Sequence, residues 1–171
     1  MNATSPCKKI IAVLIGVSTL AVTNSYAQEA TFATKSLKPE TALKAALAAL
    51  DSCRKSGYQV AVAVVDRAGL TQVMLRDRFA GPHTPDTATN KAWTAVSFRT
   101  NTTELANESQ PGKPMYGLRQ LPRAVTIGGG MMIQGGGSLY GGIGVSGAPG
   151  GAADDVCALA GIKAIADEIE F

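Results

Sequence analysis

The chain has few of the residues that several classes of site require. It contains one histidine, His83, and three cysteines among 171 residues. A structural zinc site takes about four nitrogen or sulfur ligands at close spacing, and this composition does not supply them. A serine–histidine–acid triad would have to use His83, and no serine stands in a Gly-x-Ser-x-Gly elbow. The sequence therefore argues against zinc sites and hydrolase triads.

Apolar runs long enough to cross a membrane are also missing. Residues 10–22 form a 13-residue apolar run, whereas a membrane-spanning helix needs about 20 residues. Lys8 and Lys9 precede the run, and Ser25-Tyr26-Ala27 follows it. This order predicts a signal peptide over residues 1–27. We expect the mature chain to be exported, to the periplasm or outside the cell, without inserting into the membrane.

Net charge is small once the predicted signal peptide is removed. Loss of Lys8 and Lys9 lowers the formal charge from +3 to +1. Nucleic-acid binding depends on a surplus of basic residues that neutralise phosphates, so we expect no nucleic-acid partner. The basic side chains that remain available for a small anionic ligand are Arg76, Arg78, Arg119 and Arg123.

Hydrophobic periodicity predicts one domain over residues 38–171, preceded by a flexible tail over residues 28–37. Residues 60–65 are apolar on both faces of a strand, which favours a central strand covered on both sides. The pattern as a whole predicts an α/β (α+β) fold with a central, mainly antiparallel five-stranded sheet flanked by helices. The expected elements are a helix from Pro39, strands 58–66 and 70–76, a helix from Thr84, strands 124–127, 131–134 and 138–147, and a helix over 153–169.

Side-chain spacing predicts which helix faces are buried. On the first helix we expect Leu43, Leu47 and Leu50 to face the core, since they recur at helical spacing. On the last helix we expect the core-facing set to include Val156 and Leu159, together with Ala160, Ile162, Ala164 and Ile165. Asp154-Asp155 at its start is typical of carboxylates that complement a helix N-terminus, with a catalytic or interface role as the alternative.

Glycine is concentrated between residues 128 and 151, and Gly142-x-Gly144-x-x-Gly147 formally matches a dinucleotide-binding fingerprint. That motif must end a strand and open a helix. Here the glycines lie inside a strand-like run and Pro149 follows before any helix, so we reject a dinucleotide site. The glycines favour tight hairpins or a close approach of backbone to a ligand.

Two cysteines, Cys53 and Cys157, remain in the mature chain, one in the first predicted helix and one in the last. In an oxidising compartment an even pair favours a disulfide. Such a bond would close a loop of about 100 residues and stabilise the fold by roughly 4 kcal/mol. Two buried free thiols are the alternative.

His83 lies between Pro82 and Pro85, one residue before the predicted N-cap Thr84. The partial positive charge of a helix N-terminus favours the neutral imidazole that a metal ligand requires. The prolines also limit the freedom of the segment. From the residues alone, a metal ligand and a solvated loop histidine both remain open.

Two segments carry a family resemblance: VAVVDRAGLTQVMLRDRFAGPHTPDTATNKAWTA and IGGGMMIQGGGSLYGGIGVSGAPGGAADDVCALAGI. With them the chain resembles the haem-binding HbpS/GlcG-like family, which includes the C-terminal domain of PduO-type proteins. The resemblance implies a profilin-like fold, homo-oligomers and a haem cofactor. Some members bind or degrade extracellular haem, and others have no clear role.

A haem site requires an axial ligand, an apolar slot and cations for two propionates. In this chain His83 is the candidate ligand to the iron, and Arg76, Arg78, Lys91 and Arg123 are the candidate cations. Met74, Met115, Met131 and Tyr140 are alternative axial ligands.

The resemblance leads us to expect an exported protein that scavenges, buffers or senses haem. An enzyme or accessory factor acting on a small carboxylate or other metabolite is the alternative, with His83 as general acid or base. A purely structural, oligomer-forming module is a third possibility.

Overall fold

The strand with two apolar faces is central in the sheet. The computed structural model describes residues 30–169, so the predicted signal peptide lies outside the described residues. The strands are β1 (Ala61–Asp66), β2 (Thr71–Arg76), β3 (Gly130–Gly135) and β4 (Ser138–Ser146). They form one antiparallel sheet in the order β2-β1-β4-β3. Both neighbours of β1 are therefore strands, as its pattern predicts.

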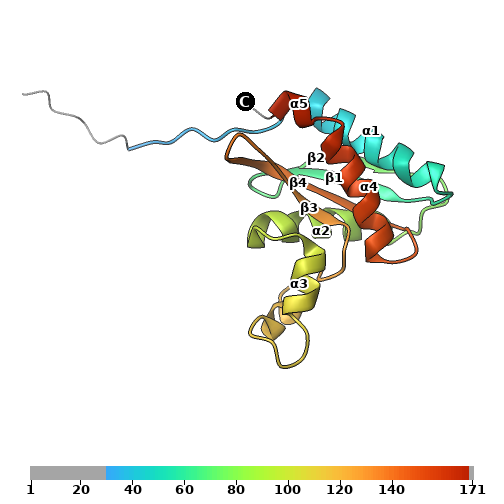
Figure 1. The fold of residues 1–171 in the computed structure, drawn as a ribbon, viewed down its shortest axis with the longest axis vertical. Helices are drawn as coiled ribbons and strands as arrows, with labels where there is room; N and C mark the ends of the chain where they lie inside the picture. Colours follow the sequence, from blue (N-terminus) through green and yellow to red (C-terminus); the bar gives the residue numbers. More distant parts are fainter. Residues whose placement is uncertain (1–29, 170–171) are drawn as a thin grey trace, which may run out of the picture. The chain divides into compact units, whose positions relative to one another are not determined.

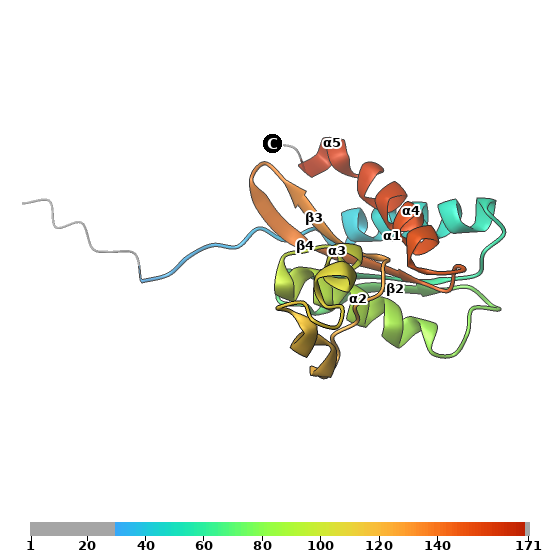
Figure 2. The same cartoon turned by 60° about the horizontal axis from the view of Figure 1, so that its bottom comes forward.

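Helices cover both faces of this sheet (Figures 1 and 2). Residues Val60, Val62 and Val64 pack in the main core with α1 (Pro39–Lys55) and α4 (Gly151–Lys163). The alternate residues of β1, such as Ala61 and Ala63, pack against α2 (Thr84–Phe98) on the opposite face. The period of two along β1 thus assigns each face its own helix layer. The remaining elements are α3 (Thr102–Glu108), the 3-10 helix η1 (Tyr116–Gln120) and α5 (Ala166–Ile169).

The described residues form four strands, so the prediction of a fifth strand over residues 124–127 is wrong. The Val125 N–H donates its hydrogen bond to the Thr94 hydroxyl on α2, at 3.0 Å, rather than to a neighbouring strand. The segment also does not lie in the core, since the side chain of Ile127 is 55 % exposed to water. It is part of the loop that joins η1 to β3.

The buried faces of the outer helices differ from the predicted ones. Leu43 and Leu47 on α1, and Val156 and Leu159 on α4, are all more than 40 % exposed. The helices instead bury their small residues: Ala42, Ala45, Ala46 and Ala49 on α1, and Cys157, Ala158 and Gly161 on α4. Small side chains let the two helices approach closely, which excludes the larger ones from the contact.

The predicted last helix is also divided, because α4 begins at Gly151 and ends at Lys163, before the separate turn α5. Its contact with α1 is tied by a disulfide between Cys53 and Cys157, whose Cα atoms lie 5.5 Å apart. Close to this bond, a side-chain carbon added at Gly161 would lie 2.6 Å from the carbonyl oxygen of Ala45. The covalent link and this close approach together determine which face of α4 is buried.

Candidate functional site

A cavity of about 630 Å³ opens where β4 leads into α4 and where α2 begins. Four parts of the chain converge there: the turn between α1 and β1, the first half of α2 with the loop before it, the loop before β3, and the glycine-rich link between β4 and α4. The lining residues are Gly57, Tyr58, Gln59, Phe79, Gly81, His83, Thr84, Thr87, Lys91, Ile127, Ser146, Gly147, Ala148, Pro149, Gly150, Gly151 and Asp154.

His83 contributes the only imidazole of the chain to this cavity. The structure corrects its predicted position by one residue: α2 begins at Thr84, so His83 rather than Thr84 is the N-cap. The Thr84 hydroxyl is buried and donates to the Gly81 carbonyl at 2.8 Å. The His83 carbonyl accepts the Thr87 N–H, at 3.0 Å, and the Thr87 hydroxyl, at 2.9 Å.

The backbone of His83 is thus fixed by the first turn of the helix, while its side chain is exposed. The imidazole lies against Gly81, where an added side-chain carbon would be 2.8 Å from its Cε1 atom. It forms no hydrogen bond with any residue in the range 30–169. Both ring nitrogens are therefore available to a ligand, on a side chain whose backbone is held in place.

A buried ion pair lines the same cavity. Lys91 Nζ lies 2.7 Å from a carboxylate oxygen of Asp154, and the two side chains are 2 % and 4 % exposed. Lys91 also donates to the Val145 carbonyl at 3.0 Å, and Asp154 accepts the Ala148 N–H at 3.0 Å. Burial raises the pKa of Asp154, and the hydrogen bond from Lys91 opposes that rise only in part. The pair joins α2 to α4 beneath the cavity.

The rim of the cavity carries two exposed apolar side chains. Phe79 is 78 % exposed and Ile127 is 55 % exposed, and both line the cavity. Large apolar side chains left in water next to a cavity are typical of a surface that receives an apolar ligand or a second protein. The site therefore combines an imidazole that has no hydrogen-bond partner among the described residues, two exposed apolar side chains and a buried ion pair without net charge.

Of the predicted cations, only Lys91 lines this cavity, and its charge is matched by Asp154. Arg76 donates to the carbonyl of Ala80. Arg78 is exposed and precedes Phe79 in the chain. The guanidinium of Arg123 lies 4.8 Å from the centre of the Trp93 ring, and Arg119 donates to the Ser109 carbonyl at 2.6 Å. The contacts of Arg119 and Arg123 hold the loop between α3 and β3.

The alternative axial ligands lie elsewhere. Met74 packs with the alanines between the sheet and α2, and Met131 packs against the main core. Tyr140 is buried, with its hydroxyl 3.4 Å from the Ile169 carbonyl. Met115, at the start of η1, is 36 % exposed and does not line the cavity. Among these candidates, the structure brings only His83 to the cavity.

The sequence did not assign three residues to this site, although it left a catalytic or interface role for Asp154 open as the alternative to helix capping. Asp154 has the sequence signature of a helix-capping carboxylate, and only its distant partner Lys91 reveals its place in the site. Phe79 and Ile127 lie in the two segments that carry the family resemblance, but the sequence assigned neither of them a role. The exposure of an apolar residue follows from its neighbours in space, so no local pattern would have revealed either of them.

Solved structures of similar fold and sequence are known. HbpS of Streptomyces reticuli, crystallised as a double mutant, is 35 % identical, with a TM-score of 0.74 over 92 % of this chain and 97 % of that chain. The structure described as a PduOC:haem complex is 34 % identical, with a TM-score of 0.72 over 76 % of this chain and 95 % of that one.

The corrinoid adenosyltransferase PduO of Salmonella typhimurium is 38 % identical over 102 residues, which are 58 % of this chain and 30 % of that protein. The chain thus spans less than a third of the length of this curated relative. A family model described as haem degrading protein HbpS-like matches residues 37–163. Because this match covers most of the chain, the protein belongs to the HbpS-like family.

Proposed function

We propose that this chain is an exported haem-binding protein that scavenges, buffers or senses haem, with His83 as the ligand to the iron. The observation that carries the proposal is the placement of the only histidine at a cavity of about 630 Å³, with no hydrogen-bond partner among the described residues. A relative of 34 % identity that has been solved with haem supports the choice of ligand.

The residues at the cavity fit such a group. His83 offers a nitrogen ligand, and Phe79 and Ile127 offer apolar contact to a flat macrocycle. Lys91 is occupied by Asp154, so we assign one propionate to Arg78, an exposed cation that precedes the lining residue Phe79 in the chain. Bound haem would supply an iron centre for redox or oxygen chemistry. The chain itself would hold the iron and shield one face of the ring.

The test is a haem titration of the mature chain, prepared without a polyhistidine tag because tag imidazoles also bind haem. We expect a Soret band that saturates at one haem per domain. His83→Ala should shift or abolish that band and weaken binding at least about tenfold, equivalent to about 1.4 kcal/mol. Met115→Ala is the matched control, because it removes an alternative ligand from outside the cavity. Its spectrum should equal that of the wild type.

Two results would contradict the proposal. One is the absence of a spectral change at stoichiometric haem. The other is a His83→Ala spectrum identical to that of the unmodified chain, which would assign the iron to another ligand.

Export and self-association are part of the same proposal and are tested separately. Residues 1–27 have the order of a signal peptide, so fractionation of cells that express the full chain should recover a shortened product outside the cytoplasm. Exposed Leu43, Leu47, Val156 and Leu159 support a homo-oligomer. Light scattering of the mature chain should therefore give a mass that is a multiple of the monomer. Within residues 30–169, no helix has the length and apolar character needed to span a membrane.

A further inference from the structure

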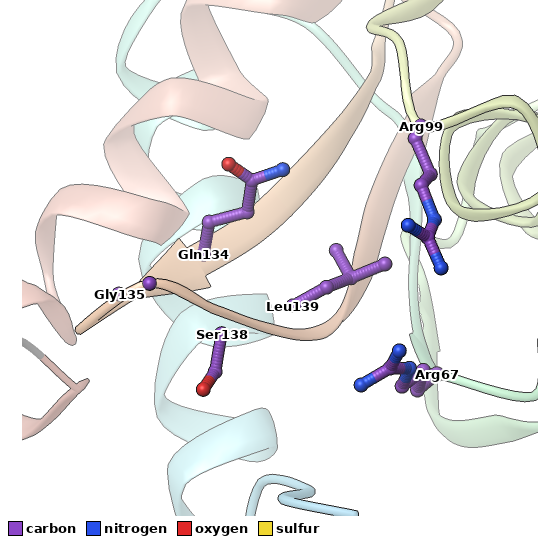
Figure 3. A pocket seen from close by; sticks show the side chains of 7 residues that line it. Arg67, Arg99, Gln134, Gly135, Ser138 and Leu139 are labelled. Carbon is purple, nitrogen blue, oxygen red and sulfur yellow. The ribbon is translucent and has the colours of Figure 1, made fainter.

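A second cavity, of about 550 Å³, lies at the opposite end of α2 from His83. It is lined by the turn between β1 and β2, the end of α2 and the hairpin between β3 and β4: Arg67, Arg99, Gln134, Gly135, Gly137, Ser138 and Leu139. Figure 3 shows the side chains of Arg67 and Arg99 reaching towards Leu139 from one side, with Gln134 on the other side. Two cations from separate elements therefore meet at one cavity.

Neither arginine has its charge balanced within the described residues. Arg67 and Arg99 take part in none of the ion pairs or side-chain hydrogen bonds found there, and among residues 30–169 no acidic side chain lines the cavity. The carboxylate of Asp66, which precedes Arg67 in the chain, accepts the N–H groups of Ala68 and Leu70 at 2.8 and 2.9 Å. Arg54, by contrast, is paired with Asp77.

The backbone holds both arginines at the cavity. Arg67 follows Asp66 in a tight hairpin turn that the Asp66 carboxylate stabilises. Arg99 ends α2 in the left-handed conformation, with φ of 49°, and its N–H donates to the Ala95 carbonyl. The end of α2 adds a partial negative charge of about half a unit. Two full positive charges exceed it, so the cavity attracts anions.

The lining also indicates the shape of the anion. A guanidinium group pairs with a carboxylate through two parallel hydrogen bonds, so two such groups match a ligand with two carboxylates. Leu139, towards which both arginines reach, is half-buried and apolar, which suits a short hydrocarbon chain. The amide of Gln134 and the hydroxyl of Ser138 add polar groups. We propose that this cavity binds a small dicarboxylate, with Arg67 and Arg99 each holding one carboxylate.

This site is separate from the cavity at His83. The helix α2 has 15 residues, and at about 1.5 Å per residue its ends lie roughly 22 Å apart. That distance is too long for the propionates of a haem held by His83 to reach Arg99. The proposal of a dicarboxylate site therefore does not depend on whether the chain binds haem.

Calorimetric titration of the mature chain with succinate tests the proposal. We expect one succinate per domain, and at least tenfold weaker binding in Arg67→Ala and in Arg99→Ala. Arg67→Lys and Arg99→Lys should each bind several-fold more weakly, because lysine keeps the charge but lacks the planar fork. Gln134→Glu should abolish binding while both arginines are kept, because it places a carboxylate in the cavity. Lys163→Ala, an exposed cation on α4, is the control and should bind as the wild type does.

Three results would overturn the proposal: no heat with succinate at several millimolar, unchanged binding in both alanine variants, or inorganic phosphate bound as tightly as succinate. The last would show a general anion site without a preference for two carboxylates. Circular dichroism of each variant confirms its folding, and Gln134→Glu keeps the test valid if an arginine variant fails to fold.

Discussion

Replacing Lys91 by methionine isolates the buried ion pair under the His83 cavity. The change keeps most of the aliphatic side chain and removes the ammonium, which lies 2.7 Å from the Asp154 carboxylate. The carboxylate would remain almost fully buried, with the Ala148 N–H as its one remaining hydrogen-bond donor among the described residues. Removing one partner of a buried pair typically costs about 3–5 kcal/mol. We expect a loss of that size in the free energy of unfolding at pH 7.

The loss should depend on pH in a defined direction. Burial already raises the pKa of Asp154 in the folded chain, and removal of Lys91 takes away the group that opposes this rise. A carboxyl whose pKa is higher in the folded than in the unfolded state favours folding when it is protonated. That contribution is complete below the unfolded pKa, near 4, and is lost as the pH rises through the folded pKa. The penalty of Lys91→Met should therefore shrink between pH 7 and pH 4.

Urea unfolding followed by circular dichroism measures this effect in the wild type, in Lys91→Met and in Lys91→Met/Asp154→Asn. Differences between variants at each pH cancel the titration of the carboxyls other than Asp154, whose surroundings the variants share. The double variant should recover much of the loss at pH 7, because an asparagine carries no charge and its oxygen still accepts the Ala148 N–H. The reasoning would be refuted if Lys91→Met were within about 1 kcal/mol of the wild type at pH 7, or if its penalty grew towards pH 4.

Two further predictions concern the packing around the sheet. Reduction of the Cys53–Cys157 bond, which links residues 104 positions apart, should lower the free energy of unfolding by about 4–5 kcal/mol; equal urea midpoints with and without reductant would contradict this. Gly144→Ala should destabilise by about 1–3 kcal/mol, because the added carbon would collide with α2. Gly117→Ala, with open space at that position, is its control in the same assay and should change stability by less than about 0.5 kcal/mol.

The sheet was largely predictable because the strand pattern is local. The apolar residues on both faces of β1 predicted a central strand, and the structure places β1 inside the sheet, between β2 and β4. The segment 124–127 has the same apolar character but is not a strand. Its Val125 N–H bonds to Thr94, which lies 31 residues away. A hydrogen-bond acceptor so distant in sequence, which takes the place of a neighbouring strand, cannot be recognised from the local pattern.

The buried helix faces were less predictable, because the most hydrophobic residues are not the buried ones where two helices pack closely. Spacing favoured Leu43 and Leu47 as core residues, yet both are substantially exposed. The contact between α1 and α4 is made by alanine, glycine and a disulfide, which allow a closer approach than leucine would. The spacing of leucines identifies the core face of a helix only where large side chains make the contact. Between α1 and α4 small side chains make it.

The candidate site was predictable in part. The place of His83 at the start of a helix follows from the flanking prolines, and the structure differs from that prediction by one residue. The arginines nearest to it in sequence do not line its cavity, whereas Arg67 and Arg99 meet at the other cavity from positions 32 residues apart. Which cations converge depends on how a hairpin turn and a helix end are placed by the sheet, and that information is not local.

The glycine-rich strand β4 connects these observations. A side-chain carbon at Gly142 would lie 2.9 Å from the Ala92 carbonyl, and one at Gly144 would lie 2.8 Å from the Ala92 N–H nitrogen. The close backbone approach expected from this run is thus made to α2, a helix of the same chain. Because α2 lies directly on β4, its two ends reach the two ends of the sheet, where His83 and Arg99 each meet a cavity. A residue larger than glycine at position 144 would therefore displace both cavities together, so Gly144→Ala should weaken haem and succinate binding in the same preparation.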